Sequence, residues 1–299
     1  MADRPRWTLE LDPPVLLPGR PVQASVQYTP DHDHESRGVR AVLHCVERYR
    51  YSRDESRMGA NGKMTSERVT HTDHAELVRL EATLAGPTRF VKGQTETWRV
   101  SFDVPSLGPA TFEGEVLRCD WTLETTVDIP MRMDEGLTQA VRVVQPMALL
   151  RAGVVDTGQY GLFEESPANV DALPAQIRLE PTPICLTEPF SGSFTVQTAE
   201  PVEVQEVRLE LRVKAEVTVP GGHEEEIVVG TGHLNTEAGR FGGAFATHPF
   251  HADAHPAWLP SIDLPHGRAR GTFHVILALS WSPDIHYVRE VALATTSEL

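Results

Sequence analysis

Alternation of apolar and polar residues in both halves of the chain constrains the fold more than any other feature of the sequence. Residues 117–129 alternate between the two kinds of side chain, with Thr125 at one of the apolar positions, and residues 207–219 alternate without exception. One face of such a strand meets a core and the other meets water, which is typical of antiparallel sheets. A parallel sheet would need interleaved amphipathic helices, and no stretch of helical length carries that pattern. The alternation therefore predicts an all-β protein.

Each half of the chain contains an Asp-aliphatic-Pro sequence, at 103–105 and at 263–265, that is followed at a constant distance by a tryptophan. The proline is Pro105 in the first half and Pro265 in the second, and a tryptophan, Trp121 or Trp281, follows each proline sixteen residues later. Each tryptophan belongs to an alternating segment, whose apolar side chains face a core. We therefore predict that Trp121 and Trp281 occupy equivalent core positions in two copies of one domain.

A second stretch of the sequence repeats as well and suggests where the domains lie. Residues 9–26 align without a gap with residues 177–194. A chain of 299 residues is long for one domain and comfortable for two of about 150 residues each. We predict two tandem antiparallel β-sandwich domains, at 1–148 and 176–299, joined by an interdomain connection at 149–175.

Charge, hydropathy and cysteine content limit the classes of function. A formal net charge of −15 repels nucleic-acid phosphates and anionic lipids, which disfavours binding of either as the main activity and leaves room only for a local basic patch on the first half. No stretch approaches the roughly 18 apolar residues of a membrane span, and the N-terminus lacks the apolar core of a signal peptide. The three cysteines form no CxxC motif, which favours a reducing compartment. We expect a soluble cytoplasmic protein.

Motifs that would indicate catalysis are missing from the sequence. No G-x-S-x-G nucleophile elbow, P-loop or G-x-G-x-x-G sequence occurs. His248, His251 and His255 are the candidate metal ligands, because His251 and His255 would share one face of a helix; Ala252, however, stands where a zincin motif needs its glutamate. We predict a protein that is not an enzyme and has no metal or other cofactor. A metal-dependent activity centred on the three histidines is the alternative.

Several segments, taken in order along the chain, resemble the arrestin family. Residues 17–22 are similar to that family's turn into its second strand, and residues 39–49 to the strand before the arrestin finger loop. Residues 98–105 resemble the family's strand that ends in an aliphatic residue and a proline. Residues 117–130 resemble the strand that follows it, with Trp121 at the usual aromatic position. The resemblance covers nearly the whole chain and is strongest to the simpler arrestin-like proteins, including microbial sporulation-control relatives. It implies a cytosolic adaptor or scaffold.

The segment at 48–64 is the candidate partner-binding site. Residues 52–67 follow a strand at 39–51, and their polar, glycine-containing sequence predicts a long finger-like loop. Tyrosine and arginine are frequent energetic anchors of protein interfaces. The candidate residues are Arg48, Tyr49, Tyr51, Arg53, Asp54, Glu55, Arg57 and Met58.

Two further surfaces follow from the predicted architecture. An exposed edge strand offers unpaired N–H and C=O groups to an incoming peptide, and the groove between the two domains offers a second site. Rotation of the domains about the connection would then regulate binding. Self-assembly through edge strands, giving a homodimer, is the other alternative to partner binding.

Overall fold

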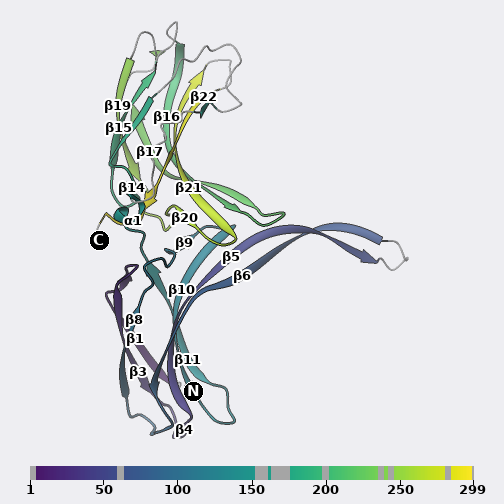
Figure 1. The fold of residues 1–299 in the computed structure, drawn as a ribbon, viewed down its shortest axis with the longest axis vertical. Coiled ribbons are helices and arrows are strands. Elements are labelled where there is room, and N and C mark those ends of the chain that lie inside the picture. The colour runs from purple at the N-terminus through teal and green to yellow at the C-terminus, as the bar shows by residue number, and fades with distance from the viewer. Residues whose placement is uncertain are drawn as a thin grey trace. The chain divides into compact units, whose positions relative to one another are not determined.

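The computed structural model is built almost wholly of β-strands, which confirms the predicted all-β fold (Figure 1). It describes residues 5–58, 64–151, 161–162, 176–196, 202–234, 239–241, 246–279 and 284–297. The chain divides into two compact units, one of residues 1–113 and 117–144 and the other of residues 114–116 and 145–299. The domain boundaries predicted at residues 148 and 176 stay predictions. None of the described helices is both long and apolar enough to cross a membrane.

Unit 1 contains two main sheets and a small third one. The first sheet has the order β1 (Arg6–Asp12), β3 (Pro21–Thr29), β8 (Glu96–Asp103). The second has the order β2 (Val15–Leu16), β11 (Glu135–Val143), β10 (Leu117–Asp128), β5 (Gly38–Met58), β6 (Met64–Ala85), and β9 (Phe112–Glu113) pairs with β10. β4 (His34–Ser36) and β7 (Thr88–Phe90) form the third.

The core of unit 1 lies between its two main sheets and follows from the alternation in the sequence. On β3 the side chains of Val22, Ala24 and Val26 are buried while the intervening residues face outward, and β10 shows the same pattern. Trp121 on β10 is 1% exposed, and its Nε1 donates a hydrogen bond of 2.8 Å to the carbonyl oxygen of Pro109. The indole therefore fills the core and has its one donor satisfied.

Unit 2 is built around one large sheet. Its order is β12 (Gly161–Leu162), β22 (Ile285–Val291), β21 (Gly267–Leu279), β16 (Val202–Val217), β17 (Glu224–Leu234), β19 (Ala246–Ala254), β15 (Phe190–Val196), β13 (Gln176–Glu180). β18 (Gly239–Phe241) pairs with β16 and β20 (Ile262–Asp263) with β21, while β14 (Ile184–Cys185) and β23 (Leu293–Ala294) pair in parallel. The helix α1 (Met147–Arg151) is short.

The large sheet of unit 2 curves round to enclose its own core. β19 and β21 lie well apart in the strand order, yet the rings of Phe250 and Phe273, one from each strand, stack with centroids 5.1 Å apart. Phe194 on β15 likewise meets Tyr287 on β22 at 5.0 Å. Both contacts join strands from opposite parts of the sheet, so the two parts face each other across an aromatic core, as in a sandwich.

The repeat that was predicted for the start of each half is confirmed by strand register. Leu9 pairs with Val26 across β1 and β3, and Ile177 pairs with Phe194 across β13 and β15. These are the residues that the ungapped alignment of the sequence matched. The two units therefore begin with the same antiparallel pair in the same register.

The prediction that Trp121 and Trp281 are equivalent is wrong. Trp121 pairs with Val141 across β10 and β11, and the matching pair across β21 and β22 is Gly271 with Val291. Gly271 therefore takes the place of Trp121 in unit 2, and Trp281 lies outside the described residues.

The Asp-aliphatic-Pro sequence led to a wrong alignment of the two units, because its two copies follow strands that are not equivalent. Pro105 follows β8, whereas Pro265 follows β20. β20 pairs with β21 as β9 pairs with β10, so β20 is the counterpart of β9 and not of β8. A proline is tolerated at the end of many strands, and the match carried little information for that reason.

Candidate partner-binding arm

The segment predicted as a long loop is instead a two-stranded ribbon that extends beyond its sheet. β5 pairs with β10 only from Gly38 to Tyr49, whereas its pairing with β6 continues to Met58, which lies opposite Met64. Figure 1 shows β5 and β6 running together beyond the end of β10. We call residues 50–58 and 64–72 the arm. At about 3.3 Å per residue its strands span roughly 30 Å, and residues 59–63 at its end are not among the described residues.

Composition explains why the arm is a ribbon although its sequence is polar. Thr65, Val69, Thr70 and Thr72 on the returning strand are β-branched, and such side chains favour extended backbone. This run of residues was the available signal for a second strand. The expectation of a loop followed instead from the lack of apolar alternation, which an exposed ribbon does not need because neither of its faces is covered.

Unit 2 has a tight turn at the position where the arm leaves unit 1. β16 pairs with β21 as far as Val217, the counterpart of Tyr49 at the end of the β5–β10 pairing. The chain then reverses at once, and the N–H of Val217 donates to the carbonyl oxygen of His223 at 2.9 Å. A Cβ on Gly222 would lie 2.0 Å from the carbonyl oxygen of Val217, so the turn needs glycine. The same strand pair therefore closes in unit 2 without an arm.

One face of the arm carries an ordered cluster of side chains. The rings of Tyr51 and His71 stack with centroids 5.5 Å apart and an interplanar angle of 26°. Arg53 donates from Nε and Nη2 to Oε1 of Glu55, at 3.1 and 3.0 Å, and Nε2 of His71 lies 3.0 Å from the same oxygen. The hydrogen bonds from Arg53 lower the pKa of Glu55, which keeps this carboxylate charged. Arg57 projects from the same face of β5, since it is two residues further along.

The opposite face of the arm is polar along its length and apolar at its described end. Asp54 lies opposite Arg68 in the register, and the hydroxyl groups of Ser52 and Thr70 are 3.1 Å apart. Met58 and Met64 face each other and are 75% and 63% exposed. Methionine is flexible and polarisable, so this pair suits an apolar contact with a partner of irregular shape.

Two of the predicted site residues lie at the base of the arm, where β10 still supports β5. Tyr49 is 8% exposed, so it is buried and cannot anchor a partner as predicted. Nε of Arg48 lies 3.7 Å from Oδ2 of Asp120 on β10. The structure brings together Tyr51, Arg53 and Glu55, with Arg57 on their face, and the ring of the buried Tyr49 lies 6.2 Å from that of Tyr51. His71, which sequence reasoning left out of this site, completes the cluster.

The three candidate metal-binding histidines do not come together. His248 and His251 belong to the strand β19, so the expectation that His251 and His255 share one face of a helix is wrong. Being three residues apart on a strand, His248 and His251 point to opposite faces. His251 is exposed, while burial lowers the pKa of His248. His255 follows the end of β19, and its N–H donates to the carbonyl oxygen of Val229 at 2.6 Å.

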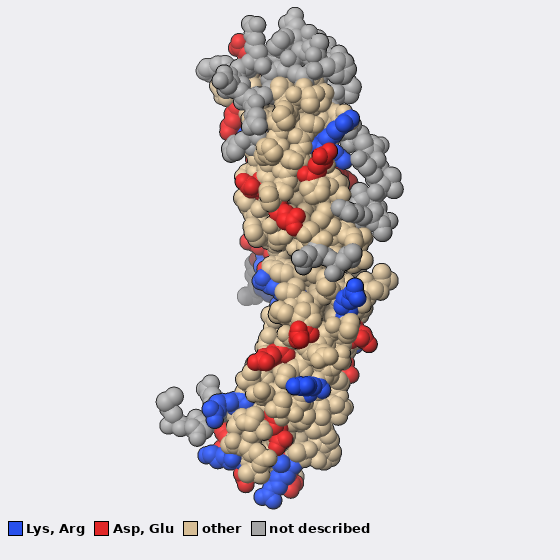
Figure 2. All heavy atoms as spheres, turned by 90° about the vertical axis from the view of Figure 1, so that its left-hand side faces the viewer, with Lys and Arg blue, Asp and Glu red and all other residues tan. Residues whose placement is uncertain are grey.

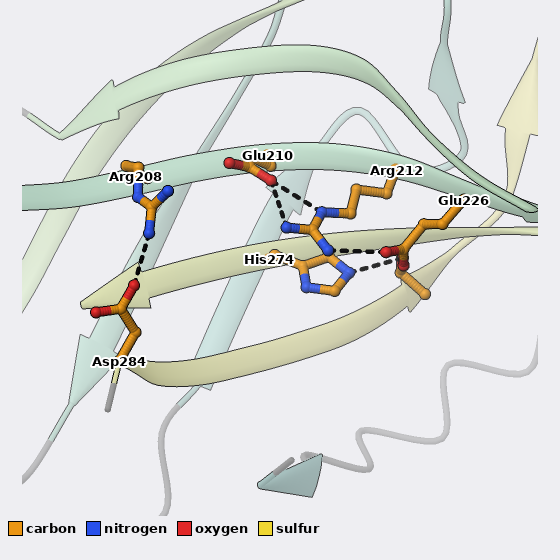
Figure 3. Close-up of polar contacts among 7 residues, drawn as sticks. Arg208, Glu210, Arg212, Glu226, His274 and Asp284 are labelled. Carbon is orange, nitrogen blue, oxygen red and sulfur yellow. Dashed lines mark hydrogen bonds and ion pairs between the residues drawn. The ribbon is translucent and has the colours of Figure 1, made fainter. Parts of the chain in front are cut away.

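A charged network lies on the outer face of β16 in unit 2 (Figure 3). Arg212 is held between two carboxylates: its Nε and Nη2 donate to Oε2 of Glu210 at 2.8 and 2.5 Å, and its Nη1 donates to Oε2 of Glu226 at 2.9 Å. Arg208 donates to Asp284 at 2.6 Å. Because these carboxylates already bind guanidinium groups, the network stabilises the sheet face and is a poor candidate for a ligand site.

His274 on β21 lies beside this network and is 3% exposed. Burial, assisted by the positive charge of Arg212, lowers its pKa to about 4. Nε2 of His274 is 2.9 Å from the hydroxyl oxygen of Thr272. The imidazole is therefore neutral at physiological pH and takes part in packing and hydrogen bonding.

Basic and acidic side chains are interspersed on the molecular face drawn in Figure 2. Among the described residues on that face, no extended basic surface is visible of the kind that binds a nucleic-acid backbone.

Comparison with known proteins identifies the type of domain in unit 1. Residues 7–150 match the family model described as Arrestin (or S-antigen), N-terminal domain. Members of that family are generally protein-binding adaptors and are typically not catalytic. No curated protein matches this chain. The matched residues include β2 to β11 and all but the first residue of β1, and with them the arm.

Proposed function

We propose that this chain is a non-catalytic cytoplasmic adaptor that binds a protein partner through the arm. The observation that carries the proposal is the difference between the two units. β5 stops pairing with β10 at Tyr49, and β16 stops pairing with β21 at the matching residue, Val217. Beyond these residues, unit 1 continues into a ribbon and unit 2 turns back. Since the fold closes without the ribbon in unit 2, packing of the sandwich does not explain its presence in unit 1.

The side chains of the arm support binding of a protein. An isolated two-stranded hairpin is marginally stable in water. A partner that covers the arm would therefore stabilise it. The stacked Tyr51 and His71 and the hydrogen-bonded Arg53 and Glu55 are already ordered, which reduces the entropy lost on binding. Tyrosine and arginine are enriched at the energetic centres of interfaces. The similarity of residues 7–150 to an arrestin N-terminal domain supports the same class of function.

The experiment replaces the arm with the turn that unit 2 uses at the same position. In the turn-swap variant, residues 50–72 are exchanged for residues 218–222, so that β5 and β6 close directly beyond Tyr49 and Asp73 takes the place of His223. A photo-crosslinking amino acid at position 57 of the otherwise unchanged chain then labels proteins of the native host that touch the arm. We expect those proteins to bind the wild type and to be lost from pull-downs with the turn-swap variant.

A matched pair of surface variants controls for loss of the hairpin itself. Tyr51→Ser with Arg53→Ser alters the ordered face, and Ser52→Ala with Thr70→Ala alters the opposite face. The first pair should weaken partner binding and the second should leave it nearly unchanged. Equal retention of the same partners by the wild type and the turn-swap variant would refute the proposal.

Self-assembly through the free edge of β6 is a second candidate function. β6 is the last strand in the order of its sheet and runs from Met64 to Ala85, so a long row of backbone groups lies at that edge. An added strand from a second copy would extend the sheet. Sedimentation of the wild type over a concentration series tests this, and dimerisation that persists in the turn-swap variant would assign the contact to residues 73–85. The resemblance to microbial sporulation-control relatives stays a prediction from sequence motifs.

A further inference from the structure

A cluster of potential metal ligands lies at one end of unit 1, away from the arm. Asp31 and His32 belong to the turn that follows β3, and Glu135 begins β11. Each of the three side chains offers one ligand atom, and these atoms lie within 4.8 Å of one another. All three residues are partly buried. The strands β3 and β11 lie in different sheets, so the cluster connects the two layers of the sandwich.

Hydrogen bonds determine the tautomer of His32. Nη1 of Arg132 lies 2.6 Å from Nε2 of His32, and a guanidinium group has only donors. Nε2 therefore accepts in this contact. Nδ1 of His32 contacts Oδ1 of Asp31, and it donates to that carboxylate oxygen. The lone pair of the imidazole is thus directed at a cation, and its proton at a carboxylate.

Glu135 is held in place by neighbours on the other side of the cluster. The hydroxyl of the buried Tyr28 donates to Oε2 of Glu135 at 2.6 Å. Burial, followed by this hydrogen bond, raises the pKa of Tyr28, so the phenol keeps its proton and remains a donor. Nε2 of His34 lies 3.3 Å from the same hydroxyl oxygen. The carboxylate of Glu135 is therefore positioned before any metal arrives.

We propose that Asp31, His32 and Glu135 form a binding site for a divalent transition metal, with zinc as the ion to test. Zinc binds imidazole nitrogen and carboxylate oxygen at about 2.0–2.2 Å, which places tetrahedral ligands about 3.3 Å apart. Ligand atoms that start within 4.8 Å reach this spacing by small side-chain rotations. The imidazole selects a transition metal over magnesium or calcium, which prefer oxygen ligands. Two carboxylates balance the charge of the ion.

Metal binding and the contact with Arg132 exclude each other. The ion takes the position of the proton between Nδ1 of His32 and Asp31, so the remaining imidazole proton moves to Nε2. Nε2 and the guanidinium of Arg132 are then both donors, and their contact is lost. Arg132 is exposed and is free to swing into solvent. It serves as the cation of the metal-free site, and zinc replaces it.

The test is a zinc titration of the full chain after removal of metal with a chelator. Competition against a chromophoric zinc chelator gives the affinity, and metal analysis after gel filtration gives the stoichiometry. We expect one zinc per chain, with affinity reduced about tenfold or more in His32→Ala and in Glu135→Gln. Arg132→Ala should bind zinc more tightly, because the competing cation is gone. His251→Ala, which removes an exposed histidine of unit 2, should bind as the wild type does.

Zinc should also raise the melting temperature of the wild type and leave that of His32→Ala unchanged, since a ligand of the folded state stabilises it. Circular dichroism checks that each variant is folded, and if His32→Ala is not, Glu135→Gln and Arg132→Ala decide. The proposal is overturned if the wild type holds less than one zinc per chain. Equal zinc affinity of the wild type and Glu135→Gln, or weaker binding by Arg132→Ala, would overturn it as well.

Discussion

Mild acid should destabilise unit 2 through His274, and the size of the effect follows from the burial of this residue. The side chain is 3% exposed on β21, and its pKa in the folded protein is lowered to about 4 from an ordinary 6.5. Burial is the main cause, and the positive charge of Arg212 adds to it. The unfolded chain therefore binds a proton at this residue more readily than the folded protein does.

The sign and magnitude follow from proton linkage. Because the folded pKa is depressed, the stabilisation is present above the unfolded pKa and is lost as pH falls toward the folded value. Between about pH 7.5 and about pH 5 the unfolded histidine becomes protonated while the folded one stays neutral. This difference lowers the free energy of unfolding by about 2 kcal/mol over that range.

Hydrogen exchange of β21, followed by mass spectrometry on peptides from residues 267–279, reports the stability of unit 2 separately from unit 1. The perturbation is His274→Gln, which keeps a polar group near Thr272 but cannot be protonated. The opening free energy of the wild type, minus that of the variant, should fall by about 2 kcal/mol from about pH 7.5 to about pH 5. The control His251→Gln removes an exposed imidazole and should follow the wild type. A difference between wild type and His274→Gln that does not change with pH would refute the reasoning.

Three further substitutions or treatments test the packing. Trp121→Ala should lower the free energy of unfolding by about 3–5 kcal/mol in a denaturant titration, because it leaves a large cavity, whereas Leu107→Ala at a 96% exposed position should change it little. Gly271→Ala should lower the melting temperature, because the new methyl group would lie 2.5 Å from a leucine side chain; Gly86→Ala, where nothing lies within 4 Å, is its control. A hydrogen bond to a second cysteine, together with burial, raises the pKa of Cys119. Iodoacetamide should therefore label the native protein slowly at neutral pH and the unfolded protein rapidly, and rapid native labelling would contradict the packing of this cysteine.

The sandwich strands could be predicted because a strand with one buried face has apolar residues at every second position. The alternation at 117–129 and 207–219 reappears as buried and outward positions of β10 and β16. The sequence of the arm shows no such alternation, because a ribbon without a covered face does not need apolar residues at every second position. Its polar composition suggested a loop, although backbone pairing and β-branched residues were sufficient to form strands.

Other features could not be predicted because they depend on tertiary contacts or on exceptions to local rules. β19 contains Pro249, and a proline argues against a strand, so the sequence did not predict this strand at the nearby histidines. Asp31, His32 and Glu135 are brought together by the packing of two sheets, and their spacing in the sequence carries no metal-binding pattern. Gly271 replaces Trp121 at an equivalent position, and only strand register shows this.

The tight turn at residues 218–223 has a consequence for engineering this chain. At this position the length of the hairpin can change without changing the core, since unit 2 closes there and unit 1 extends well beyond it. Placing the sequence of residues 50–72 between Val217 and His223, in place of residues 218–222, would lengthen β16 and β17 without adding a residue to the sandwich interior. A chain with two such recognition elements would be bivalent, so linkage would raise its avidity for clustered targets while each single contact kept its own affinity.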